Sequence, residues 1–254
     1  MILTTEAATS SSTRSATRQI VGTMSPTQDL LSNLSPSIRD RIPNDDVSTT
    51  ALQLAYDALP APILNHSIRV FLLARWLAEK EGDTAWTSAD KLPLVFTAAV
   101  LHDVGAGDLY NGTQRFEVEG ADAAKAHLHS KGISSADSHQ VWVAIAIHTS
   151  AGIAERIDPL SRLIRIAVKM DFSRALAEEQ GATAYAQSIE DHLPRLDVEK
   201  ALGDAVVKQA RKIPDKIDSL TWPSSEKHPS ASWPGILLRA HLENPGHDGA
   251  NPAF

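Results

Sequence analysis

The sequence contains no cysteine. Neither disulfide bonds nor thiolate metal sites can therefore form, and any bound metal must be held by nitrogen and oxygen atoms. Ten histidines can supply the nitrogen. Long hydrophobic runs are also missing, since none approaches the ~18 to 20 residues that a membrane-spanning helix needs. We therefore expect no membrane-spanning helix.

Positive charge is scarce as well. Lys and Arg number 24 against 31 Asp and Glu, which gives a formal net charge of -7 and a pI of about 5.8. This balance argues against non-specific binding to nucleic acid or to anionic membranes. We expect neither as a partner, and we expect a cytoplasmic location.

The domain organisation follows from composition. With 43% hydrophobic residues in 254, the chain can form one sizeable core. Residues 1–28 are rich in Ser and Thr and predict a disordered N-terminal tail, although a transit peptide shares this composition. Residues 29–213 are predicted to form one helical domain. Residues 214–254 are Pro- and Ser-rich and are expected to be a C-terminal extension that packs on the domain.

Apolar residues recur at three- and four-residue spacing along most of the chain, which predicts helices. We find no alternating strand pattern and no internal repeat. The fold class is therefore predicted to be all-α, a bundle of about six to eight helices. The expected helices span about 48–59, 63–81, 88–102, 117–129, 136–148, 159–179 and 196–213, with a short one near 234–243.

The stretch from Leu92 to Leu101 is apolar on all sides, as is typical of a helix buried on every face. Ser88 can cap its start. The stretch leads directly into His102 and Asp103 and then breaks at Gly105. An imidazole and a carboxylate at the end of a buried helix are costly to desolvate unless each meets a partner.

Three further polar side chains occupy inward positions of their helices. His66, His148 and Asp171 each continue an apolar stripe. Taken singly, an inward histidine is usually a hydrogen-bonded core residue, and an inward aspartate usually pairs with an arginine.

A single divalent cation would satisfy four of these side chains at once, namely His66, His102, Asp103 and Asp171. We favour this shared site over four separate partners. Two imidazole nitrogens and two carboxylate oxygens suit borderline or hard cations, so we expect one divalent ion, with zinc first and Fe, Mn, Co, Ni or Mg as alternatives. Such an ion lowers the pKa of bound water and polarises the group under attack, which predicts hydrolysis or hydration.

These residues also carry a family resemblance. Asn65–Phe71 (NHSIRVF), Leu101–Gly105 (LHDVG) and Asp171 resemble the H...HD...D signature of the HD-domain metal-dependent hydrolase superfamily, whose members are all-helical. Arg115-Phe116-Glu117, followed by GADAA at 120–124, makes the chain similar to the cyanamide-hydratase-like branch. The resemblance covers roughly residues 47–212.

The resemblance implies that residues 29–213 form an HD-type bundle with a metal site in its core. It implies ligand roles for His66, His102, Asp103 and Asp171, and it makes His148 a base or substrate contact rather than a ligand. Fungal cyanamide hydratases have a glutamine and an aspartate after this histidine, where the present chain has Thr149 and Ser150. This departure bears on the substrate and leaves the metal site unchanged.

Three other residues are candidates for catalysis. Glu117 and Asp108 could shuttle a proton for a metal-bound water, or each could be a solvated loop carboxylate. Arg69 could orient a ligand carboxylate, bind an anion or form a surface ion pair. The remaining histidines, His127 among them, are expected on the surface, and Phe96 and Trp142 are expected to line the core or a pocket wall.

The expected function is that of a metal-dependent hydrolase or hydratase acting on a small molecule, through hydration of cyanamide or a related nitrile or isocyanide. The alternative is phosphohydrolysis of a nucleotide or other phosphomonoester, for which Arg69, Arg115 and Lys169 are the available basic residues. A metal-stabilised binding protein without turnover is a third interpretation, favoured if protein closes every coordination position. A homo-oligomer remains open.

Overall fold

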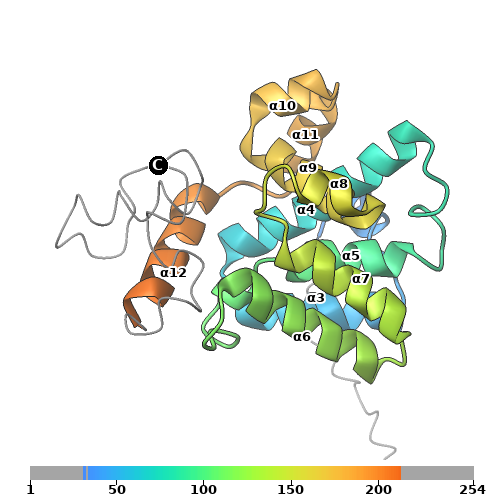
Figure 1. The fold of residues 1–254 in the computed structure, drawn as a ribbon. Helices are drawn as coiled ribbons and strands as arrows, with labels where there is room; N and C mark the ends of the chain where they lie inside the picture. Colours follow the sequence, from blue (N-terminus) through green and yellow to red (C-terminus); the bar gives the residue numbers. More distant parts are fainter. Residues whose placement is uncertain (1–30, 33, 213–254) are drawn as a thin grey trace, which may run out of the picture.

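The computed structural model describes residues 31, 32 and 34–212, and this part of the chain is helical without any strand (Figure 1). It contains eleven complete α-helices and one 3-10 helix, which confirms the all-α prediction, whereas the predicted number of about six to eight helices was too low. The elements are α2 (Pro36–Arg39), α3 (Asp46–Ala58), α4 (Ala61–Glu81), α5 (Leu92–Leu101), η1 (Val104–Ala106), α6 (Phe116–Ser130), α7 (Ser135–Ala146), α8 (Ala154–Ile157), α9 (Pro159–Phe172), α10 (Arg174–Glu179), α11 (Thr183–Glu190) and α12 (Val198–Lys212).

The predictions for the tail at 1–28, the extension at 214–254 and the helix near 234–243 lie outside the described residues. Across the residues that are described, no helix has both the length and the apolar character needed to cross a bilayer.

Side-chain caps fix several helix starts. The Asp45 carboxylate accepts a hydrogen bond from the Ser48 amide at the start of α3, and Asp158 does the same for Ser161 at the start of α9. At the other end of α4, Gly82 adopts the left-handed conformation with φ 71°, which ends the helix. These signals are local in sequence, so the predicted starts of α3 and α9 and the predicted end of α4 agree with the structure to within about two residues.

Two predicted boundaries were wrong. Helix α5 begins at Leu92 and not at Ser88, whose hydroxyl donates to the Ala85 carbonyl within a preceding turn. The expected helix 159–179 is broken at Ser173, whose extended backbone and side-chain oxygen cap the separate helix α10. The short helices α2, α8 and α10 carry too few turns for an apolar stripe to reveal them.

Helices α4 and α5 form the centre of the bundle. Helix α4 packs against α5 and α9, while α5 also contacts α3 and α7. Every residue of α5 from Leu94 to Leu101 is buried. Helix α12 lies apart from the other helices in Figure 1 and contacts α4 and η1. A polar side chain on the inner face of α4 or at the end of α5 is consequently removed from water.

Helix α6 approaches the segment after α5 closely through two glycines. A Cβ atom on Gly105 would lie 2.0 Å from the Phe116 carbonyl oxygen and 2.7 Å from the Gly120 amide nitrogen. A Cβ on Gly120 would lie 3.1 Å from the Leu101 carbonyl oxygen. The absence of side chains at both positions lets the backbone of α6 pack directly against the turn that carries His102 and Asp103.

We expect Gly105→Ala to lower the free energy of unfolding by about 3 kcal/mol or more, because the clashing atoms belong to the backbone and cannot rotate away. Urea denaturation measures the change. Gly112→Ala is the matched control, since the three atoms nearest its Cβ belong to the Glu119 carboxylate, which can rotate away at the loss of its hydrogen bond from the Gln114 amide, and we expect a change of at most about 1 kcal/mol. Equal stability of the two variants would contradict the close approach.

Candidate metal centre

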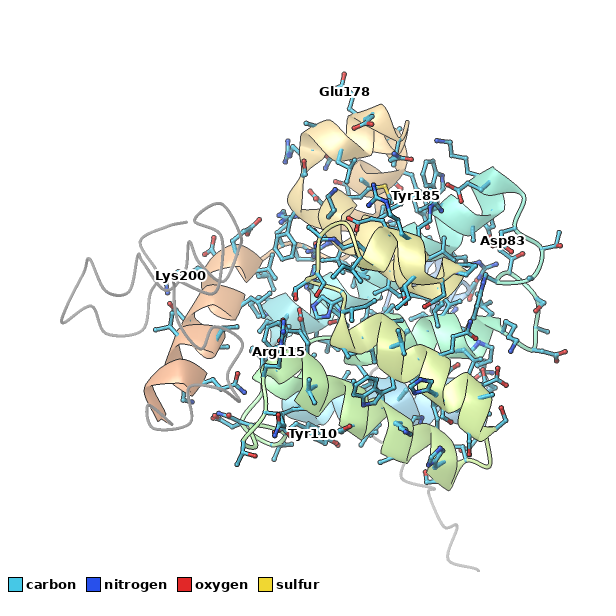
Figure 2. The ribbon with its side chains drawn as sticks, in the orientation of Figure 1. Asp83, Tyr110, Arg115, Glu178, Tyr185 and Lys200 are labelled. Carbon is cyan, nitrogen blue, oxygen red and sulfur yellow. The ribbon has the colours of Figure 1, made fainter. Side chains whose placement is uncertain are left out.

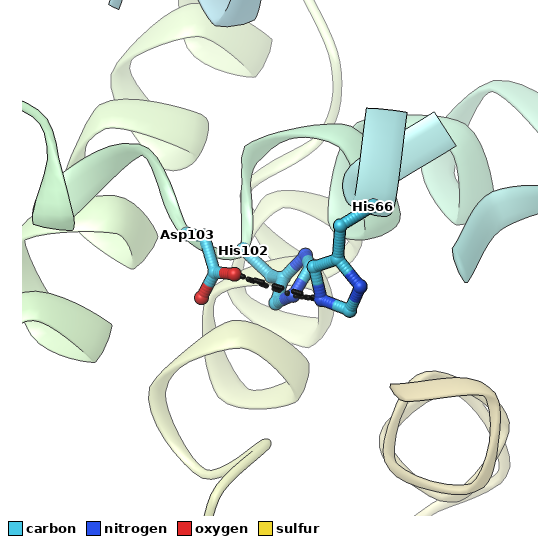
Figure 3. A group of neighbouring side chains, drawn as sticks. All are labelled: His66, His102 and Asp103. Atoms are coloured by element: carbon cyan, nitrogen blue, oxygen red, sulfur yellow. Dashed lines mark hydrogen bonds and ion pairs between the residues drawn. The ribbon is translucent and has the colours of Figure 1, made fainter. Parts of the chain in front are cut away.

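Three buried side chains converge at the end of α5 (Figure 3). His66 comes from α4, His102 caps α5, and Asp103 follows it directly. The Nε2 atoms of the two imidazoles are 3.2 Å apart. Asp103 Oδ2 lies 3.2 Å from His102 Nε2 and 3.6 Å from His66 Nε2. None of the three residues is more than 1% exposed.

The hydrogen bonds behind the imidazoles fix their tautomers. His102 Nδ1 lies 2.7 Å from the Ala99 carbonyl oxygen, and His66 Nδ1 lies 2.7 Å from Asp171 Oδ2. A carbonyl and an ionised carboxylate only accept hydrogen bonds, so each Nδ1 carries the proton. In the neutral rings, Nε2 is then an unprotonated acceptor that points into the cluster.

Asp103 has no donor in this arrangement. Both of its carboxylate oxygens are buried without a hydrogen-bond partner. The cluster therefore brings two nitrogen lone pairs and a carboxylate together in the interior, where an unpartnered polar atom costs roughly 1 to 3 kcal/mol. This set of donor atoms is suited to bind a cation.

The spacing of the three atoms fits a divalent ion. Ligand atoms ~2.0 to 2.2 Å from one ion, at tetrahedral or octahedral angles, lie ~2.8 to 3.6 Å apart. The observed separations of 3.2, 3.2 and 3.6 Å lie within this range. His66, His102 and Asp103 could thus hold one divalent ion, with no cysteine required.

The pKa directions favour an ionised carboxylate at this centre. Burial alone would raise the pKa of Asp103, but His102 and His148 outweigh it and hold that pKa well below its ordinary value. Burial lowers the pKa of His66. Burial would also lower the pKa of His102, yet the adjacent Asp103 carboxylate raises it. The centre therefore keeps its carboxylate ionised.

Asp171 lies on the opposite side of His66 from the cluster. Its Oδ2 meets Nδ1 of His66 and not the converging Nε2 atoms. Burial would raise the pKa of Asp171, but hydrogen bonds from Arg69 and His66 lower it. The sequence predicted a direct ligand here. That role stays a prediction, and in the structure the Asp171 carboxylate accepts a hydrogen bond from His66 Nδ1 and so fixes the tautomer and orientation of this imidazole.

Arg69 is buried completely, so the surface ion pair considered for it is wrong. Its Nε and Nη2 donate to the two Asp171 oxygens at 2.7 and 2.8 Å, and its Nη1 donates to the Leu193 carbonyl at 2.9 Å. This paired geometry supports the orientation of a carboxylate and not the binding of an anion.

His148 lies beside the cluster, just after the end of α7. Its Nδ1 donates to the Ile145 carbonyl at 2.7 Å, and its Nε2 lies 3.6 Å from Asp103 Oδ1. Its ring is 4.8 Å from that of His102. His148 thus faces the second oxygen of Asp103, and Arg165 holds its backbone carbonyl from α9.

Glu117 is fully buried, which overturns the alternative of a solvated loop carboxylate. Arg115 donates to Glu117 Oε1 at 2.8 Å, and the Thr149 hydroxyl donates to the same oxygen at 2.7 Å. Arg115 stands at the start of α6 (Figure 2). Burial would raise the pKa of Glu117, but Arg115 outweighs it and lowers that pKa, with a contribution from His148. The carboxylate is therefore ionised close to His148.

Asp108 does not join this group. Its carboxylate is 63% exposed and pairs with Lys208 of α12 at 2.8 Å. The glycine-bearing loop after η1 turns its side chain toward the surface, so the prediction of a proton shuttle here is corrected.

Two predictions outside the centre are also resolved. His127 is 7% exposed, and its Nε2 lies 2.9 Å from the Val47 carbonyl oxygen, so the expectation of a surface histidine was wrong. Phe96 is buried in the core as expected, and Trp142 is partly buried with its indole N–H donating to Asp122.

The buried pair of Glu117 and Arg115 gives a testable dependence of stability on pH. Because the folded-state pKa of Glu117 lies below the ordinary glutamate value of 4.5, the contribution of the ion pair to stability is fully present above about pH 4.5. It is lost as the pH falls through the folded-state pKa. We expect Glu117→Gln to cost about 2 kcal/mol at pH 7 and progressively less below pH 4.5.

Thermal unfolding of both proteins from pH 7 to pH 3 measures this change. Glu178→Gln, at an exposed site on α10 (Figure 2), should leave the stability unchanged to within about 0.5 kcal/mol. A loss that stays constant across the pH range would count against the ion pair.

Some residues around the centre were not found from the sequence. Thr149 was noted only as a departure from relatives, and Phe172 and Arg195 were not considered. Arg195 reaches back to α9, where its Nη1 donates to the Asp171 carbonyl oxygen at 2.6 Å. The motif around Arg115 and Glu117 was a sequence signal for the surroundings of Thr149. Arg195 lies on no periodic apolar stripe, so no signal in the sequence pointed to it.

Comparison with known proteins bears on this centre. Residues 63–173 match the family model described as the HD domain. A comparison with curated proteins found no match. The matched range begins in α4, which carries His66, and ends just after α9, which carries Asp171. Residues 63–173 are therefore similar to the HD domain, and this range contains the buried cluster of His66, His102 and Asp103.

Proposed function

We propose that the protein is a metal-dependent hydratase that adds water to a small uncharged substrate with an unsaturated carbon–nitrogen bond, such as cyanamide or a related nitrile or isocyanide. The observation that carries this proposal is the state of the basic residues. The basic residues considered for phosphate binding either pair with carboxylates or lie on the surface. The acceptor atoms of the centre, in contrast, suit a metal cation.

A phosphomonoester would need positive side chains at the open side of the ion. Arg69 is occupied by Asp171, and Arg115 is occupied by Glu117. Lys169 is exposed on α9. The described surroundings of the centre therefore favour a neutral substrate over a phosphorylated one.

The neighbours of the imidazoles also favour a small, weakly polar ligand. The Phe116 ring lies 5.7 Å from that of His148, and the Phe172 ring lies 4.6 Å from that of His66. Small-molecule sites typically combine such apolar walls with a few polar groups that fix orientation. His148, beside Asp103, and the adjacent Thr149, which contacts Glu117, supply polar groups here.

His66, His102 and Asp103 would hold the ion, and Asp171 keeps His66 in the tautomer that this requires. When bound, a divalent ion lowers the pKa of water and polarises a carbon–nitrogen multiple bond. His148 Nε2 carries a lone pair and can accept a proton from water and deliver it to the substrate nitrogen. The Glu117 carboxylate stabilises the transient imidazolium of His148.

The atoms balance without any further reactant. The oxygen of water bonds to carbon and the addition breaks one carbon–nitrogen π bond. Tautomerisation then replaces the second carbon–nitrogen π bond by a carbon–oxygen π bond, and both hydrogens of water end on nitrogen. A nitrile gives an amide, and cyanamide gives urea. An isocyanide instead gives a formamide, with one hydrogen on nitrogen and one on carbon.

The test is an assay of metal-loaded protein against two substrate panels. Urea, amide or formamide formation is followed with cyanamide, small nitriles and isocyanides, and phosphate release is followed with nucleotides and phosphomonoesters. We expect turnover with the first panel, abolished by chelation and restored by metal. Turnover of the phosphate panel alone would replace this proposal with phosphohydrolysis, and no turnover in metal-loaded protein would favour a binding role.

A further inference from the structure

Phe172, the last residue of α9, contacts a buried imidazole of the centre and is itself partly exposed to solvent. Its ring lies 4.6 Å from the His66 ring with an angle of 43° between the planes. Phe172 is nevertheless 38% exposed, whereas His66 is 0% exposed. One side of the ring therefore covers a predicted metal ligand while another part meets water.

The other aromatic neighbour of the imidazoles differs in this respect. Phe116 contacts His148 but is fully buried. Phe172 thus combines contact with a buried imidazole of the centre and partial exposure to solvent. This position allows its ring to shield His66 from water.

Arg195 fixes the backbone beneath this ring. Its guanidinium carbon lies 5.9 Å from the centre of the Phe172 ring, and its Nη1 donates to the Asp171 carbonyl. Its guanidinium also pairs with Glu190 and Glu199, and its Nη1 lies 3.7 Å from Asp171 Oδ2. These carboxylates balance the charge of the Arg195 guanidinium beside the Phe172 ring.

We propose that Phe172 closes the solvent side of the metal centre and sets the size of the molecule that reaches it. This inference rests on the proposed function, because it presupposes an ion at His66, His102 and Asp103. A phenyl ring over His66 would hinder the approach of a bulky ligand more than that of a ligand of a few atoms. Phe172 is thus a specificity-determining residue that selects small substrates by exclusion.

The test uses the full-length protein loaded with Co²⁺, whose visible spectrum reports ligand binding. Metal content is first measured by elemental analysis, and azide and 2-methylimidazole are then titrated into the wild type, Phe172→Ala and Phe172→Leu. We expect azide to bind all three with Kd values within about 3-fold, and 2-methylimidazole to bind Phe172→Ala at least about 10-fold more tightly than the wild type. Phe172→Leu should lie between them.

Ile157→Ala is the control, since Ile157 is 54% exposed on α8, and it should leave both Kd values unchanged. An unchanged ratio of the two Kd values in Phe172→Ala would overturn the inference while leaving the metal centre intact. A gain from Thr149→Ala in its place would put the opening beside α7 and would also overturn it. Failure of the wild type to bind Co²⁺ would overturn the proposed function as well.

Discussion

His102→Ala is expected to leave the protein without bound metal and to reduce turnover at least about 1,000-fold. His102 Nε2 is central to the cluster, at 3.2 Å from both His66 Nε2 and Asp103 Oδ2. Its loss leaves two donor atoms, which are too few to hold a divalent ion tightly. Elemental analysis of protein purified without chelator gives the metal content, and the hydration assay gives the activity.

His139→Ala is the matched control because His139 is exposed on α7. It should retain both metal and activity. Circular dichroism before and after heating shows whether His102→Ala remains folded, and His66→Ala provides a second test should it not. One bound ion per chain in either variant would refute the assignment of these ligands.

Arg69→Met should cost about 3 to 5 kcal/mol of the free energy of unfolding, since it leaves a buried carboxylate without its cation. Arg69 is 0% exposed and donates twice to Asp171. Asp171 in turn positions His66, so we also expect weaker metal binding. Urea denaturation measures the stability, and a Co²⁺ titration measures the affinity.

Arg75→Met provides the comparison on the same helix. Arg75 pairs with Glu79 at 2.7 Å, but both side chains are partly exposed, and such pairs contribute at most about 1 kcal/mol. Similar losses in the two variants would mean that the pair of Arg69 and Asp171 contributes no more than a surface ion pair.

Helical periodicity predicted the convergence of His66, His102 and Asp103. His66 lies three residues after Ile63 and four before Val70, both buried, so its direction follows from the helix alone. His102 and Asp103 end a helix that is apolar all round, which has only the core to enter. Information local to each segment was therefore sufficient for the three residues.

The partners of these residues depend on contacts that no single segment encodes. Asp171 was correctly predicted to point inward, but a stripe does not specify which face of the His66 ring it meets. That choice depends on Arg69 and on the Leu193 carbonyl, which is 124 residues further along the chain. Glu117 is buried because Arg115 and Thr149 neutralise and cap it, and Thr149 belongs to a different segment.

The hydrogen bond between His66 and Asp171 spans 105 residues of sequence. A nascent chain that has emerged only as far as α7 already contains His66, His102 and Asp103, yet it lacks the acceptor that sets the protonation of His66 Nδ1. The imidazole is then free to alternate between tautomers, only one of which directs its lone pair toward His102. High affinity for an ion should consequently arise late in synthesis, once α9 has docked against α4.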